Sequence, residues 1–194
     1  MKKGDYISTI LRSKKTVFSF KDIALLWGDS GGAARVRVNY YVKNGDLYRI
    51  RKGIYAKDKN YDKFELATRI FTPSYVSFET VLGQVGITFQ YYSQIFVASY
   101  LTREITCNGQ IYSFRKIKDL VLTNKTGIKN KGEYSMATKE RAFLDTIYIR
   151  KDYHFDNLSP LDWDKVFEML PVYNNQRMAK KVKEFYKHFK FNQE

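Results

Sequence analysis

The sequence predicts an α+β protein with two domains, one over residues 1–72 and one over residues 73–194. Three observations lead to this prediction. Apolar residues recur at helical spacing in the first part of the chain, strand-like alternation follows at residues 47–57 and 94–122, and helical spacing returns toward the C-terminus. With 44% hydrophobic and 16% aromatic residues in 194, the chain has enough apolar side chains for two cores. The second domain is expected to be mixed α/β, with a small sheet and C-terminal helices.

Two short helices are expected first. Residues 5–12 place their apolar side chains on one side of a helix. Ser19 and Asp22 then have the spacing of a capping box, in which the two side chains satisfy free backbone N–H groups where a helix starts. A second helix should therefore follow. Its inward side chains are expected to be Ile23, Leu26 and Trp27.

A third helix is expected over residues 31–43. At about 100° per residue, its core face holds Ala34, Val38, Tyr41 and Val42. The other side is polar and basic, which suits the major groove of DNA because arginine and asparagine can hydrogen-bond to base edges. The candidate DNA-binding residues of this helix are Arg35, Arg37, Asn39, Tyr40 and Lys43.

The segment after the third helix changes to a period of two. Gly45 can take the left-handed conformation that ends a helix. The strand that follows is expected to place Leu47, Arg49 and Arg51 on one face and Tyr48 and Ile50 on the other. A turn at Lys52-Gly53 and a return strand over residues 54–57 complete a hairpin. The candidate DNA-binding residues of the hairpin are Arg49, Arg51 and Lys52.

This order of elements, helix, helix, turn, helix and hairpin, predicts a winged helix-turn-helix domain that binds DNA. The alternative is an ordinary amphipathic helix followed by a surface hairpin whose charges only keep the protein in solution. The distribution of charge favours DNA binding. The whole chain carries a net charge of +14, and residues 1–60 contribute +9 of it, with 14 Lys/Arg against 5 Asp/Glu. An excess of this size indicates a polyanionic partner.

The second domain begins after Pro73. Residues 61–72 predict a helix that leads out of the first domain, with apolar positions at Phe64, Ala67, Ile70 and Phe71. A further helix is expected from Ser77 to Gly86, with Phe78, Val81, Leu82 and Val85 on one side. Strands are expected at residues 95–101, 104–107 and 111–114, and Asn108-Gly109 is a strong signal for a two-residue hairpin turn.

The rest of the second domain is expected to be mostly helical. A loop over residues 125–132 and a short strand over 134–137 precede a helix that Thr138 caps. Within that helix Phe143 shares a side with Ile147 and Glu140, and Asp145, on another side, is only half expected to be exposed. Two more helices are expected at residues 160–170 and 175–191. The last has an apolar stripe of Met178, Val182, Phe185 and Phe189, and lysines cover its other sides.

Several function classes have little support in the sequence. Residues 28–32 resemble the segment around the nucleophile of chymotrypsin-like proteases, but no histidine precedes Ser30 to act as its base. The two histidines, His154 and His188, belong to no metal-ligand cluster, so we expect no catalytic residue, metal or cofactor. The single cysteine, Cys107, is expected to be a buried or strand-facing small side chain. The N-terminal Met1-Lys-Lys is not followed by an apolar run, which favours a cytoplasmic protein with no membrane partner.

Two stretches give the chain a resemblance to the AbiEi family of antitoxins from type IV toxin-antitoxin systems. The first is the hairpin over residues 45–55, in which a basic strand runs into Gly-Ile-Tyr and is similar to the family's wing. The second is a pair of segments, Tyr75-Val-Ser-Phe-Glu-Thr-Val-Leu-Gly and Ala137-Thr-Lys-Glu-Arg-Ala-Phe-Leu-Asp145, which resemble two helix starts of the C-terminal antitoxin domain. Together they span about the whole chain.

The resemblance implies a transcriptional autorepressor that binds its own promoter through the N-terminal domain. It also implies a C-terminal domain that counteracts a nucleotidyltransferase toxin encoded nearby, without a stable complex between the two. The closest alternative is a stand-alone winged-helix regulator whose C-terminal domain dimerises or senses a ligand. RNA binding is a further alternative, because the 16 tyrosines and 14 phenylalanines could stack on bases, but most of them lie at apolar-face positions typical of a core.

Overall fold

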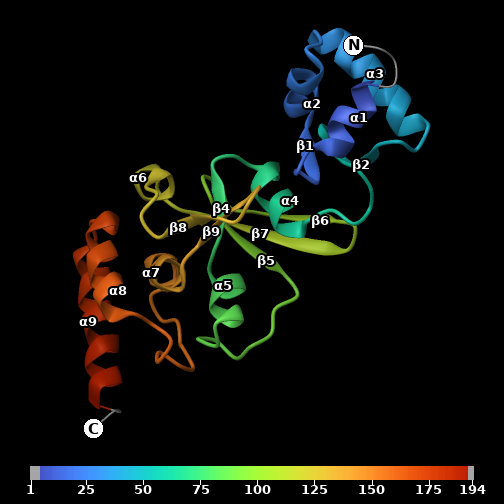
Figure 1. The fold of residues 1–194 in the computed structure, drawn as a ribbon. Helices are drawn as coiled ribbons and strands as arrows, with labels where there is room; N and C mark the ends of the chain where they lie inside the picture. Colours follow the sequence, from blue (N-terminus) through green and yellow to red (C-terminus); the bar gives the residue numbers. More distant parts are fainter. Residues whose placement is uncertain (1–4, 192–194) are drawn as a thin grey trace. The chain divides into compact units, whose positions relative to one another are not determined.

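The computed structural model describes residues 5–191 and divides the chain into two compact units, Met1–Ile70 and Phe71–Glu194. Both units combine helices with a β-sheet, so the protein has an α+β fold (Figure 1). The division falls after residue 70, whereas the sequence places the domain boundary after residue 72. Met1, Lys2 and Lys3, which entered the expectation about targeting, lie outside the described residues.

Unit 1 contains four helices and a three-stranded antiparallel sheet in the part of the chain that the structure describes. The elements are α1 (Asp5–Arg12), β1 (Val17–Ser19), α2 (Phe20–Trp27), α3 (Gly31–Lys43), β2 (Tyr48–Arg51), β3 (Ile54–Ala56) and α4 (Lys63–Ile70). The strand order is β1-β3-β2. The predicted capping box is confirmed, since the side chains of Ser19 and Asp22 each accept a hydrogen bond from the other residue's backbone N–H.

The core of unit 1 is aromatic and aliphatic. Its buried residues are Tyr6, Ile10, Phe18, Ile23, Trp27, Val38, Tyr41, Leu47 and Tyr55. Two expectations about this unit were wrong or incomplete. Leu26 is 42% exposed instead of buried, because α2 turns Ile23 and Trp27 toward the core. Strand β1 was not expected; it pairs with β3 across 35 or more residues of sequence, so no local pattern predicts it.

Unit 2 is built on a mixed six-stranded sheet. Its strands are β4 (Ser74–Val76), β5 (Ile95–Ser99), β6 (Arg103–Cys107), β7 (Gln110–Lys116), β8 (Ile128–Asn130) and β9 (Ser135–Ala137). Their order is β6-β7-β5-β4-β9-β8, with parallel pairs β5–β7 and β4–β9. The hairpin at Asn108-Gly109 is confirmed, since both residues have positive φ and β6 pairs with β7 across them. Cys107 is buried, as expected.

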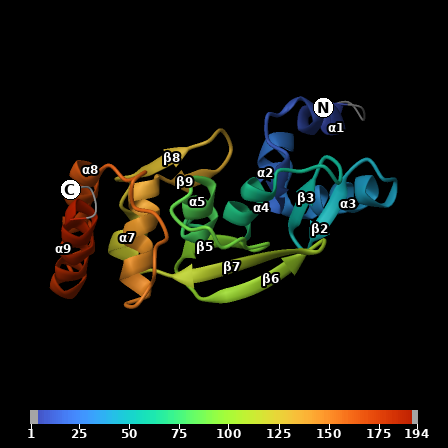
Figure 2. The same ribbon diagram turned by 90° about the horizontal axis from the view of Figure 1, so that it is seen from below.

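Unit 2 has six helical elements in the part of the chain that the structure describes. They are α5 (Glu79–Gln84), α6 (Asp119–Thr123), α7 (Lys139–Ile149), α8 (Trp163–Met169), the 3-10 helix η1 (Leu170–Tyr173) and α9 (Gln176–Phe191). Figures 1 and 2 show α7 between α5 on one side and the α8–α9 pair on the other. Thr138 caps α7, as predicted, by accepting a hydrogen bond from the backbone N–H of Arg141.

Four features of unit 2 differ from the expectations. The helix expected from Ser77 starts at Glu79, because residues 74–76 form strand β4 and Phe78 has a positive φ of 56°. The loop expected at residues 125–132 contains strand β8, and α6 was not expected at all. The helix expected from residue 160 starts at Trp163, where the side chain of Asp162 accepts a hydrogen bond from the backbone N–H of Lys165.

A buried polar network lies inside unit 2, where α7 meets β4 and η1. The guanidinium of Arg141 donates to Asp145 Oδ1 at 3.1 Å and to Tyr75 Oη at 3.0 Å. Tyr75, Ser77 and Tyr173 donate their hydroxyl groups to the carboxylate of Asp145, at 3.0, 2.8 and 2.6 Å. Arg141 also donates to the backbone oxygens of Val121 and Thr126. Asp145 is therefore completely buried, whereas the sequence pattern left its exposure open.

Among the helices that the structure describes, no helix combines the length and the apolar composition needed to span a bilayer.

Candidate nucleic-acid interface

The turn between α2 and α3 sets the direction of α3. Gly28 closes α2 in the left-handed conformation, with φ of 65°, and its N–H bonds back to Ala24 and Leu25. Asp29 follows this turn directly and accepts a hydrogen bond from Arg37 Nε at 2.9 Å. The pair ties the turn to the middle of α3.

Arg37 is half-buried and lies against Tyr6 and Asp29 of unit 1. Its guanidinium stacks on the ring of Tyr6, 3.7 Å from the ring centre, while it bonds Asp29. The hydrogen bond with Asp29 raises the pKa of Arg37. A guanidinium held in this way has fewer donors free for a DNA base, so Arg37 has the geometry of a residue that positions α3.

The exposed face of α3 carries the other candidates of the helix. Arg35, Asn39 and Lys43 are spaced four residues apart, so they line one side, and all three are exposed. Tyr40 is 46% exposed and packs edge to face on the buried Tyr41. The core face matches the prediction at Ala34, Val38 and Tyr41, which are buried, whereas Val42 is only half-buried.

A hydrogen bond joins the hairpin to α3. Arg49 Nη2, from β2, donates to Asn39 Oδ1 at 2.7 Å, and the Arg49 guanidinium lies 5.7 Å from the ring centre of Tyr55 on β3. Both Arg49 and Asn39 are exposed, so this link lies at the surface. Since the bond uses the side-chain oxygen of Asn39, the two donors of its amide nitrogen are not engaged in that bond.

The strand alternation expected for the hairpin was wrong at Arg51. A bulge between Arg49 and Arg51 shifts the register of β2 against β3, and the turn that follows has Gly53 at φ of 82°. Leu47 lies before β2 and is buried, whereas Arg49 is exposed. Arg51 is half-buried, and its Nη1 is buried without a hydrogen-bond partner among residues 5–191. Lys52, in the turn, is exposed.

Six of the eight candidate residues are therefore exposed on α3 or the hairpin: Arg35, Asn39, Tyr40, Lys43, Arg49 and Lys52. The structure holds Arg37 and Arg51 partly inside the unit. The sequence did not single out Asp29 and Tyr55, which support Arg37 and Arg49. For Asp29 a signal exists, since an acidic residue directly after a helix-ending glycine is well placed to meet a basic residue of the next helix.

The charge around these residues is strongly positive. Residues 31–57 hold seven Lys/Arg and a single Asp, a net charge of +6. Within the described chain, residues 5–191, no group of three or more His, Cys, Asp or Glu side chains is arranged to hold a metal ion. Because of the net charge of +6 on residues 31–57, this surface can attract an anionic ligand.

Comparison with known proteins adds no identification: no protein-family model matches the chain, and no curated protein matches it.

Proposed function

We propose that unit 1 is a winged helix-turn-helix domain that binds duplex DNA at the promoter of its own gene and represses it. The observation that carries the proposal is the hydrogen bond between Arg49 and Asn39, because it fixes a basic hairpin beside the exposed face of a basic helix. A helix with a hairpin at its side is the element pair that winged-helix proteins use to contact the major groove and the adjacent backbone.

The exposed residues divide into two roles. Arg35 and Asn39 lie near the middle of α3, where side chains can reach base edges, and each such contact contributes roughly 1–3 kcal/mol of discrimination. Lys43, at the end of α3, and Lys52, in the hairpin turn, bind phosphates as point charges. Arg49 donates a hydrogen bond to Asn39 and is exposed, so its guanidinium can also contact the phosphate backbone of DNA.

For unit 2 we propose an antitoxin function that opposes a nucleotidyltransferase toxin encoded nearby, without a stable complex and without catalysis by this chain. The support is the resemblance of two segments to the AbiEi family, together with their place in the fold. The parallel pairing of Val76, in the first segment, with Met136, the residue directly before the second, brings the two segments close together. Their residues Tyr75, Ser77, Arg141 and Asp145 meet in the buried network described above.

Two variants test whether the activities separate. Arg49→Glu with Lys52→Glu places carboxylates where phosphates would lie, so repression in a promoter-reporter assay should fall to the level without the protein. Growth rescue in cells that co-express the neighbouring toxin should persist. The matched control is Lys14→Glu with Lys63→Glu, which makes the same charge change at exposed positions of α4 and of the α1–β1 segment, outside α3 and the hairpin.

The outcomes distinguish the proposed functions. Loss of rescue together with repression in the hairpin variant, at unchanged protein level, contradicts the division of labour. If no neighbouring gene arrests growth, the chain is a stand-alone regulator and the antitoxin proposal fails. If the control variant loses repression as completely as the hairpin variant, the assignment of the hairpin to DNA is wrong.

A further inference from the structure

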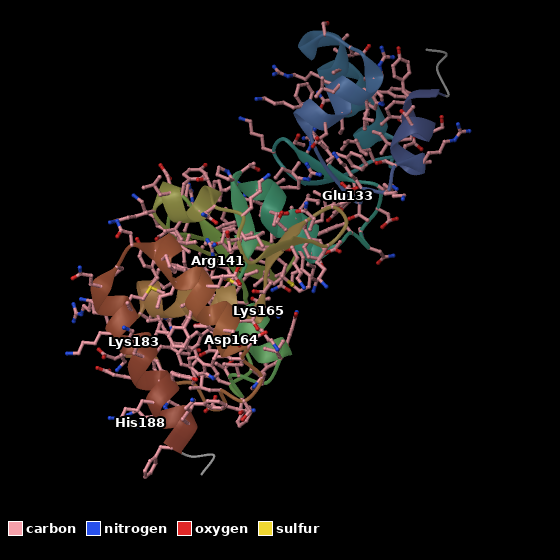
Figure 3. All side chains as sticks on the ribbon, turned by 60° about the vertical axis from the view of Figure 1, so that its left-hand side comes forward. Glu133, Arg141, Asp164, Lys165, Lys183 and His188 are labelled. Carbon is pink, nitrogen blue, oxygen red and sulfur yellow. The ribbon has the colours of Figure 1, made fainter. Side chains whose placement is uncertain are left out.

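The outer face of α9 carries a row of lysines. Lys180, Lys183, Lys187 and Lys190 follow one another at spacings of three or four residues, so they lie on one side of the helix, and all four are exposed. Figure 3 shows Lys183 on the outer side of α9, while Arg141 lies inside the unit. With Arg177 and Lys151, these residues form what we call the α9 basic surface.

The charge of unit 2 is concentrated in this helix. α9 contains six Lys/Arg and one Glu, a net of +5, whereas residues 71–175 contain 12 Lys/Arg and 11 Asp/Glu, a net of +1. Within α9 as described, Glu184 forms an ion pair with Lys181 at 3.9 Å. The structure shows no ion pair for Lys180, Lys183 or Lys187 with any of the residues it describes.

The arrangement of the lysines along α9 lowers the stability of the helix. Like charges three or four residues apart repel, at a cost of a few tenths of a kcal/mol per pair. The first turn of α9 also has no acidic residue, although the N-terminal end of a helix favours negative charge. Only Lys190, in the last turn, benefits from the helix dipole. The lysine row is therefore better explained by an anionic partner than by the needs of the helix.

A groove at the N-terminal half of α9 brings in a cation from another segment. It has a volume of about 360 Å³ and lies between α9 and the end of α7. Lys151, from the segment after α7, lines it together with Arg177, Lys180 and Lys181, and Tyr148 contributes an aromatic side chain. The carboxylates of Asp152 and Glu184 also line the groove, so four cationic side chains there outnumber two anionic ones. Basic side chains from two segments thus converge where the row begins.

The opposite face of α9 is already occupied. Met178 and Val182 are buried, Phe185 packs against Phe143 at 5.9 Å between ring centres, and Phe189 packs against Trp163 at 5.5 Å. Since the apolar stripe packs on the core of unit 2, it is not available to insert into a membrane surface. What it offers to a partner is charge.

We propose that the α9 basic surface binds the phosphate backbone of nucleic acid, as a second contact separate from the interface on unit 1. The row from Lys180 to Lys190 covers ten residue steps, or about 15 Å at 1.5 Å per residue. A duplex presents a negative charge about every 1.7 Å along its axis, so several phosphates lie within that length. A line of charges matches an extended polyanion better than a compact phosphorylated molecule. The cations recognise no base edge, so this contact is independent of sequence.

The test measures the affinity of the full chain for a random-sequence duplex at several salt concentrations. The background carries Arg35→Gln and Arg49→Gln, so that the result for α9 does not depend on whether unit 1 binds DNA. In this background, Lys180, Lys183 and Lys187 are changed to Gln, which keeps a good helix former at each position. The matched control changes Lys125, Lys129 and Lys131 to Gln, three exposed lysines of the same unit.

The α9 variant should lower the slope of log K against log salt by about 2–3, since each lost phosphate contact removes about 0.9. The control should keep the slope of the background protein. Equal slopes in the α9 variant and the control overturn the proposal, whatever unit 1 does. Polyglutamate of matched charge tests the partner class: if it binds as tightly as the duplex and loses affinity through the same three changes, the surface fits an acidic polypeptide and the assignment to nucleic acid is wrong.

Discussion

Removing one partner of the buried Arg141–Asp145 pair should destabilise unit 2 severely. Both side chains are completely buried, and they are joined at 3.1 Å. In Asp145→Asn the guanidinium keeps its bonds to Tyr75 and two backbone oxygens but loses its counter-ion. A buried charge left without a partner costs about 3–5 kcal/mol, which is a large share of the stability of a small domain.

The size of the effect follows from the size of the unit. Phe71–Glu194 has about 124 residues, so 3–5 kcal/mol corresponds to a fall in Tm of roughly 10–20 °C. In Arg141→Met the carboxylate keeps three hydroxyl donors, so the loss should lie at the lower end of that range. The double variant Arg141→Met, Asp145→Leu removes both charges and should cost less than the sum of the two single losses.

Urea and thermal unfolding, followed by circular dichroism and tryptophan fluorescence, measure these differences. Trp163 lies in unit 2 and Trp27 in unit 1, so fluorescence of a Trp27→Phe variant reports on unit 2 alone. A loss of less than about 1 kcal/mol in the free energy of unfolding of Asp145→Asn would refute the reasoning, because removing the counter-ion of a buried guanidinium should cost more than that. Additive losses in the double variant would show that the two charges are not coupled.

Two further predictions concern unit 2. Burial and the charge of Asp145 raise the pKa of Tyr173 well above its ordinary value of 10.0, so the folded state keeps a proton that the unfolded state releases. The contribution of Tyr173 to the free energy of unfolding is therefore fully present below pH 10 and falls as the pH rises beyond it, by about 1.4 kcal/mol per pH unit for each such tyrosine. Tyr173→Phe should make this fall shallower in urea unfolding between pH 9 and 11. An unchanged pH dependence would contradict the assignment. Phe143→Ala removes a completely buried ring that packs on Phe155 and Trp163, and it should lower the free energy of unfolding of unit 2 by about 3–5 kcal/mol. Growth rescue should be lost before repression. The reverse order would count against an antitoxin role for unit 2.

Local signals predicted their structures well. The helix expected over residues 31–43 has those bounds in the structure, and the capping box at Ser19 and the turn at Asn108-Gly109 form as expected. Each of these features depends on residues within a few positions of one another, so a short stretch of sequence contains all the chemistry that decides it.

Features that depend on distant partners could not be predicted in the same way. Strand β8 is short and polar, and it forms because β9 pairs with it. Asp145 is acidic on a helix, which favours exposure, yet its partners Tyr75 and Ser77 come from 70 and 68 residues earlier. At the interface, helical spacing could place Arg37 on α3 but could not show that Asp29 and Tyr6 contact its guanidinium.

The most direct measurement compares the affinity of the full chain for the DNA upstream of its own gene with its affinity for a shuffled duplex of equal length. Fluorescence anisotropy at fixed salt gives both constants for the wild-type chain and for Arg35→Ala with Asn39→Ala. We predict that the wild-type chain prefers its upstream DNA, and that the variant loses this preference by roughly 10–100-fold or more while its affinity for shuffled DNA changes little. Equal binding of the two duplexes by the wild-type chain, or an equal loss on both in the variant, would contradict the assignment of α3 to the major groove.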